Sequence, residues 1–167
     1  MSAPVEVLRR KLVERLKEVA PDLHFDVVGA DGKFLRIAAK YPDVGDLVVW
    51  VEDEEIIIEI SGLANGLTHS HFDRYSLYPE AKEEELADRI VEAAVDHLLA
   101  VVTDQVVIEI ELRAGRVRSV TTADREYYME QMTSRVVPAG VEKKTYLWSG
   151  PIRFDGGSAD PCTVNGV

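Results

Sequence analysis

Between residues 23 and 60, four strand-like runs follow one another, and they constrain the fold more than any other feature of the chain. The runs cover residues 23–27, 34–39, 47–51 and 56–60. Each is rich in β-branched or aromatic residues, and the links between them are short and carry turn formers such as Asp31-Gly32. Parallel neighbours would need a crossover of roughly a dozen residues or more. The sequence therefore predicts an antiparallel meander.

Two amphipathic segments flank these runs. Residues 5–19 carry apolar side chains at three- and four-residue spacing, and Pro21 ends the pattern. Residues 80–102 form the second segment, and the glutamates at 83–85 suit the first turns of a helix because of the helix dipole. His97 lies on the apolar stripe of this segment, where we expect it to be partly buried and hydrogen-bonded to a neighbour. We expect both helices to pack on one face of the sheet.

The C-terminal part of the chain returns to strand-like patterns. Residues 105–121 alternate between apolar and polar side chains on both sides of an Ala114-Gly115 turn, which predicts a hairpin. Thr122 is placed to cap a short helix over residues 123–132. The extended segment 143–148 is predicted to add an edge strand.

These patterns predict the α+β fold class. The expected architecture is an antiparallel meander sheet with an N-terminal helix and a central helix packed on one face, followed by a hairpin, a short helix and an edge strand. A chain of 167 residues has the length of one domain, which we assign to residues 1–154. Residues 155–167 are rich in Gly, Ser and Pro, and we expect a flexible tail there.

The charge balance limits the partners that the protein can have. The chain carries 30 acidic and 19 basic side chains, whereas nucleic acids are bound through Lys and Arg. We therefore expect no nucleic acid and no membrane as a partner. No apolar run approaches the roughly 20 residues that cross a bilayer, and residues 1–4 lead into charged sequence that lacks the apolar core typical of a signal peptide. The lone Cys162 cannot form an internal disulfide, so we expect a cytoplasmic protein.

Residues 61–79 show no clear periodicity, and loops of that length are often functional. They contain the string Thr68-His69-Ser70-His71-Phe72-Asp73, with half of the chain's four histidines. Imidazoles two residues apart in an extended segment point the same way and can share an ion.

The string resembles the Thr-His-x-His-x-Asp-His signature of metallo-β-lactamase-like hydrolases. In that family the alternating histidines bind one metal ion, the aspartate and the last histidine bind a second, and a bridging hydroxide is the nucleophile. The resemblance implies that His69 and His71 match ligands of the first metal and Asp73 a ligand of the second. Arg74 stands where the family has its last histidine.

This departure favours a smaller site, in which His69, His71 and Asp73 hold one divalent ion instead of two. His24 or His97 could join them through the fold, and zinc, nickel and manganese all accept imidazole and carboxylate ligands. The sequence offers no nucleophile elbow and no phosphate loop, so we predict no catalytic residues and no resident organic cofactor. A metal-binding protein or a metal-dependent hydrolase is thus the alternative function.

The leading hypothesis is a small acidic binding or assembly module, chaperone-like or immunity-like in its size, charge and order of elements. Tyrosines are favoured where an apolar surface must tolerate water, as at protein interfaces. The predicted partner-binding residues are Tyr75, Tyr78, Tyr127 and Tyr128. We expect a protein or peptide partner that is held by the 61–79 segment and the acidic surface, and the acidity favours a basic partner. We also expect self-association through an edge strand or the aromatic helix.

Overall fold

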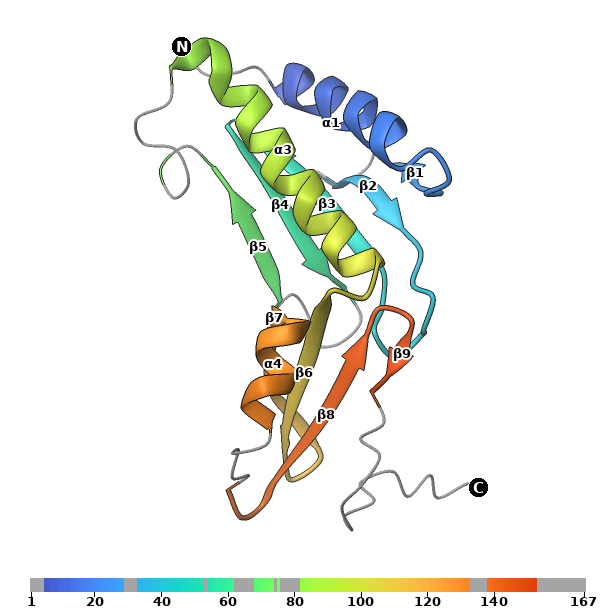
Figure 1. Ribbon diagram of the computed structural model, residues 1–167, viewed down its shortest axis with the longest axis vertical. Helices are drawn as coiled ribbons and strands as arrows, with labels where there is room; N and C mark the ends of the chain where they lie inside the picture. Colours follow the sequence, from blue (N-terminus) through green and yellow to red (C-terminus); the bar gives the residue numbers. More distant parts are fainter. Residues whose placement is uncertain are drawn as a thin grey trace.

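The computed structural model describes residues 5–28, 33–52, 54–61, 68–73, 75, 82–132 and 138–152. It consists of helices and two antiparallel sheets, so the predicted α+β class is confirmed (Figure 1). The predicted tail at 155–167 and the start of the central helix at residue 80 lie outside the described residues.

The predicted meander is confirmed, and it is one strand longer than the sequence indicates. Its strands are β1 (Asp26–Val27), β2 (Lys33–Ile37), β3 (Leu47–Glu52), β4 (Glu55–Ile60) and β5 (His69–Phe72). They lie side by side in chain order, and each neighbouring pair is antiparallel. Strand β5 corrects the expectation that residues 61–79 hold no regular element. Its backbone pairs with β4, so its conformation comes from an existing strand and not from its own pattern.

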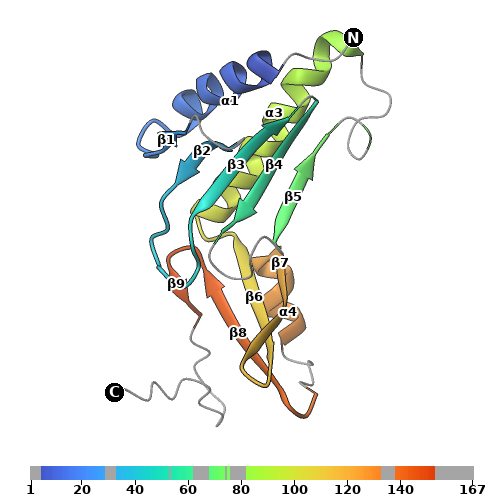
Figure 2. The ribbon, with the colours of Figure 1, turned by 180° about the vertical axis from the view of Figure 1, so that it is seen from behind.

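Helices α1 (Val5–Val19) and α3 (Glu83–Val102) pack against each other and cover one face of this sheet, as predicted (Figure 1). Their fully buried side chains include those of Leu8, Leu12 and Leu16 in α1 and of Ile90, Ala94, Leu98 and Val101 in α3. Figure 2 shows the opposite side of the sheet, where β3 and β4 lie in front of α3 and none of the described helices crosses them.

The remaining strands form a second sheet instead of extending the first. They are β6 (Val106–Arg113), β7 (Arg116–Asp124), β8 (Val141–Leu147) and β9 (Gly150–Pro151), in the order β7-β6-β8-β9. The predicted hairpin is β6 with β7, and it turns at Ala114-Gly115 as expected. The last predicted strand is β8, which pairs with β6 on one side and with the two-residue β9 on the other.

Helix α4 (Arg125–Met132) starts two residues later than predicted. The reason is that β7 continues through Asp124, which still pairs with Val106. The carboxylate of Asp124, and not the hydroxyl of Thr122, accepts the backbone N–H of Tyr127 at 3.0 Å, as an N-cap does. In the part of the chain that the structure describes, no helix combines the length and the apolar character needed to span a membrane.

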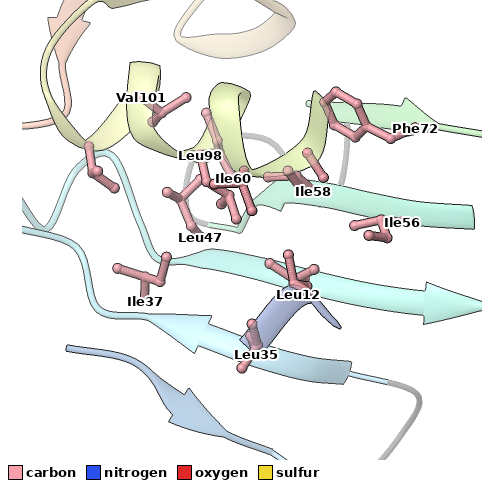
Figure 3. Close-up of a cluster of buried hydrophobic side chains, with 14 of the residues drawn as sticks. Leu12, Leu35, Ile37, Leu47, Ile56, Ile58, Ile60, Phe72, Leu98 and Val101 are labelled. Carbon is pink, nitrogen blue, oxygen red and sulfur yellow. The ribbon is translucent and has the colours of Figure 1, made fainter. Parts of the chain in front are cut away.

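One hydrophobic core joins the two helices and both sheets. Figure 3 shows its centre, where Ile56, Ile58 and Ile60 of β4 point toward α3. Ile108 and Trp148 extend the same cluster into the second sheet. Because side chains alternate along a strand, burying every second residue of β4 turns Glu55, Ile57 and Glu59 to the opposite side of the sheet. The core therefore decides which side chains face away from the helices.

Candidate functional site

The side chains that alternate with the core residues form a surface on the five-stranded sheet that no helix of the described residues covers, and we call this surface the outer face. One part of it is formed by Trp50 from β3, Glu55, Ile57 and Glu59 from β4, and His69 and His71 from β5. The ladder fixes their arrangement, because Ile57 pairs with both Trp50 and His71, and Glu59 pairs with His69. The outer face thus sets two apolar side chains among carboxylates and imidazoles.

A shallow depression of about 220 Å³ lies on this face. Its lining residues are Trp50, Ile57, Glu59, His69 and His71. Ligand pockets for drug-sized molecules usually measure roughly 300–1,000 Å³. The depression therefore suits a single side chain or a small ion better than a large cofactor.

The two histidines of β5 lie side by side, as their spacing predicts. Their ring centroids are 4.8 Å apart and the rings meet edge to face. Both side chains are exposed, because the residues between and after them, Ser70 and Phe72, turn toward α3. The structure therefore brings His69 and His71 together on the outer face.

Glu55 holds the ring of His71 from the neighbouring strand. Its Oε1 atom is hydrogen-bonded to Nδ1 of His71. A carboxylate only accepts, so Nδ1 is the nitrogen that carries the hydrogen. In the neutral ring, Nε2 then keeps its lone pair for another partner.

The predicted metal ligands do not all converge. Within the described ranges, no three His, Cys, Asp or Glu side chains gather closely enough to hold a metal ion. Asp73 follows the end of β5, and His24 precedes β1 at the other edge of the sheet, while Arg74 lies outside the described residues. The ligand set of His69, His71 and Asp73 therefore stays a prediction.

His97 belongs to the other side of β5. Its Nε2 lies 3.3 Å from the Ser70 hydroxyl, and its ring packs on Phe72 with centroids 5.4 Å apart. Burial between α3 and β5 lowers the pKa of His97 below its ordinary value. The expectation of a partly buried, hydrogen-bonded histidine is confirmed, and His97 faces away from the His69–His71 pair.

The predicted partner-binding tyrosines have different surroundings. Tyr75 is 82% exposed and Tyr127 is 60% exposed, so both can meet a partner. Tyr128 is 5% exposed, and its hydroxyl donates a hydrogen bond to Glu109 inside the fold. Tyr78 lies outside the described residues. Partner binding through these tyrosines, and self-association, stay predictions.

Helix α4 covers a polar cluster on the four-stranded sheet. Glu109 of β6 is 5% exposed and accepts hydrogen bonds from Tyr128 Oη and from Lys143 Nζ, each 2.7 Å long. Thr145 Oγ1 lies 3.1 Å from the same hydroxyl. These partners compensate the buried carboxylate, so the cluster has a role in attaching α4 to its sheet.

Sequence reasoning missed four residues of the outer face, namely Trp50, Glu55, Ile57 and Glu59. The acidic stretch at 52–55 has the composition of a solvated turn, but Glu55 is already the first residue of β4. The signal was the alternation of β4, which places Glu55, Ile57 and Glu59 together opposite the core. Their meeting with the histidines required the β4–β5 pairing, which the sequence does not indicate.

Comparison of the chain with protein-family models, with curated proteins and with solved structures finds no match.

Proposed function

We propose that the protein is a small acidic binding module that takes a basic peptide segment of a partner protein on the outer face. The observation that carries this proposal is that the apolar side chains of Trp50 and Ile57 are paired across β3 and β4, with Glu55 and Glu59 on either side of Ile57 along β4. An apolar pair bordered by carboxylates matches a lysine or arginine side chain, whose stem is apolar and whose head is charged.

The indole of Trp50 provides the specific contact. Arginine and lysine are attracted to the face of a tryptophan ring, and tryptophan is the strongest of the aromatic residues in this respect. Trp50 is half-buried and lines the depression together with Glu59. A guanidinium group in the depression can thus stack on the ring and pair with a carboxylate.

The distribution of charge supports a basic partner. Residues 1–104, which include the five-stranded sheet, carry 22 acidic and 11 basic side chains, whereas residues 105–152 carry 6 and 7. The negative field therefore belongs to the part of the molecule that bears the outer face. Such a field speeds the approach of a cationic partner and weakens as salt is added.

Fluorescence anisotropy with labelled ten-residue peptides tests the proposal, with chelator in the buffer. One peptide carries arginines, and its matched control carries glutamines at the same positions. We expect binding of the arginine peptide alone, with an affinity that falls as the salt concentration rises. Equal binding of both peptides, or binding of neither, contradicts the proposal.

Two variants locate the binding surface. Trp50→Ala should weaken binding by about 2 kcal/mol or more, as buried aromatic contact residues usually do. Tyr127→Ala is the matched control, because Tyr127 is an exposed aromatic residue on α4, outside the outer face. If Tyr127→Ala weakens binding and Trp50→Ala does not, the partner binds at α4.

A further inference from the structure

We propose that His69 and His71 form a binding site for one transition-metal ion of the Zn²⁺, Ni²⁺ and Cu²⁺ class, with Glu55 as the residue that positions His71. The proposal rests on the geometry of β4 and β5 and does not depend on the peptide-binding function. The ion would occupy the part of the depression lined by the histidines, beside Trp50 and Ile57.

The two imidazoles are prepared for a common ion by the strand. Alternation places both on the outer face, and the ladder with β4 fixes the backbone of each, through Glu59 opposite His69 and Ile57 opposite His71. On the inner face, Phe72 is buried and anchors the end of the strand. The ring centroids are 4.8 Å apart, which is close enough for both imidazoles to reach one ion.

The contact between Glu55 and His71 has the form of an outer-sphere contact in a metal site. Histidine ligands commonly donate their second ring N–H to a carboxylate, which fixes the tautomer and raises the basicity of the ligating nitrogen. Here Nδ1 of His71 meets Glu55, so Nε2 is the nitrogen available to the ion. This contact distinguishes the pair from two histidines that merely lie next to each other.

Glu59 supplies negative charge beside the two imidazoles, which are the protein ligands, since no three His, Cys, Asp or Glu side chains of the described residues gather closely enough to hold an ion. Glu59 pairs with His69 across the ladder and lines the same depression, so its carboxylate shares the face with both rings. Imidazole ligands suit zinc, nickel and copper, whereas magnesium and calcium require oxygen ligands. Water completes the coordination of such a site.

Isothermal titration of the full chain with NiCl₂ or ZnCl₂ tests the site, in a Cys162→Ser background that removes the one thiol. We expect one ion per chain and no binding of MgCl₂. Glu55→Gln should lower the affinity by about 10–100-fold, as loss of an outer-sphere carboxylate does. His71→Ala should lower it further, because it removes a ligand.

The matched control is His24→Ala, because His24 is an exposed histidine near the opposite edge of the sheet. It should leave the affinity unchanged. The double variant His69→Ala/His71→Ala overturns the proposal if it binds Ni²⁺ as tightly as the parent while its circular dichroism spectrum is native. Equal loss of affinity in His24→Ala and His71→Ala also overturns it.

A second readout separates binding at the pair from a change in folding. Co²⁺ bound to the parent should give a visible absorption spectrum of tetrahedral type that Glu55→Gln shifts and His69→Gln removes. Because peptide binding is measured with chelator and metal binding without peptide, failure of one proposal is distinguishable from failure of the other. An absent cobalt spectrum together with an absent titration signal rejects the metal site alone.

Discussion

Glu109 and Glu59 are the same residue type in comparable places, and their surroundings differ completely. Each belongs to a strand beside the common core, β6 or β4. Helix α4 covers Glu109, and Tyr128 and Lys143 satisfy both of its oxygens. Glu59 lies half-buried on the outer face together with His69 and Trp50. None of the described helices crosses β3 and β4 on that side of the sheet (Figure 2). A polar strand face is structural where a helix covers it and is accessible to a ligand where it is not covered.

The largest effect should come from removing the carboxylate on the covered face. Glu109→Ala leaves Lys143 and Tyr128 without a shared acceptor, and breaking a buried pair in this way costs about 3–5 kcal/mol. Unfolding in urea, followed by circular dichroism, measures the change. Glu126→Ala is the control, because Glu126 is exposed on α4 and its loss should change the free energy of unfolding by less than about 0.5 kcal/mol.

Adding Lys143→Met to Glu109→Ala should recover part of the lost stability, since no uncompensated buried charge then remains. If Glu109→Ala unfolds at the same urea concentration as the parent, the covered face is not held by its polar cluster. The face under α4 and the outer face would then differ in their exposure to solvent but not in what their carboxylates contribute to stability.

A smaller effect on the free energy of unfolding should come from His97, whose side chain contacts β5 from α3. Burial lowers the pKa of His97 in the folded protein, so the unfolded chain, with an ordinary pKa of 6.5, takes up the proton first. Stability from this group is therefore complete above about pH 6.5 and falls as the pH drops toward the folded pKa. His97→Gln should lose less stability than the parent between pH 7.5 and 5.5. Urea midpoints at both pH values measure the difference, and equal losses would contradict this expectation.

The smallest effect on stability should come from the uncovered face. Glu59→Gln removes a charge without leaving a buried partner, so the free energy of unfolding should change by no more than about 0.5 kcal/mol. The same variant should nevertheless weaken binding of the arginine peptide, because it removes a carboxylate from the depression. A loss of stability close to that of Glu109→Ala would show that the two faces do not differ as proposed.

The sequence is sufficient for those parts of the fold that local pattern decides. Alternation predicts the strands of the meander, and helical spacing predicts α1 and the stripe of α3. Strand β5 escaped prediction because His69, Ser70 and His71 have no strong strand pattern, and the strand arises from pairing with β4. The division of the strands into two sheets was not predicted for a related reason. A hairpin pattern identifies β6 and β7 as partners, but it does not indicate which further strand pairs with β6.

The candidate site was predictable only in part. The spacing of His69 and His71 was sufficient to place both on one face, and the structure has them there. The contact of His71 with Glu55 joins residues 16 positions apart, and that of Glu109 with Lys143 joins residues 34 apart. Such contacts depend on register and on helix docking, which composition and periodicity do not contain.

The two-residue period of β4 and β5 has an evolutionary consequence. Ile56, Ile58 and Phe72 belong to the core, while the side chains that alternate with them along β4 and β5 face the other side of the sheet and take no part in the core. Substitutions at Glu55, Ile57, Glu59, His69 and His71 can therefore accumulate with little cost to folding. The surface chemistry of this face can thus change one outward position at a time, while the inward positions keep the scaffold constant.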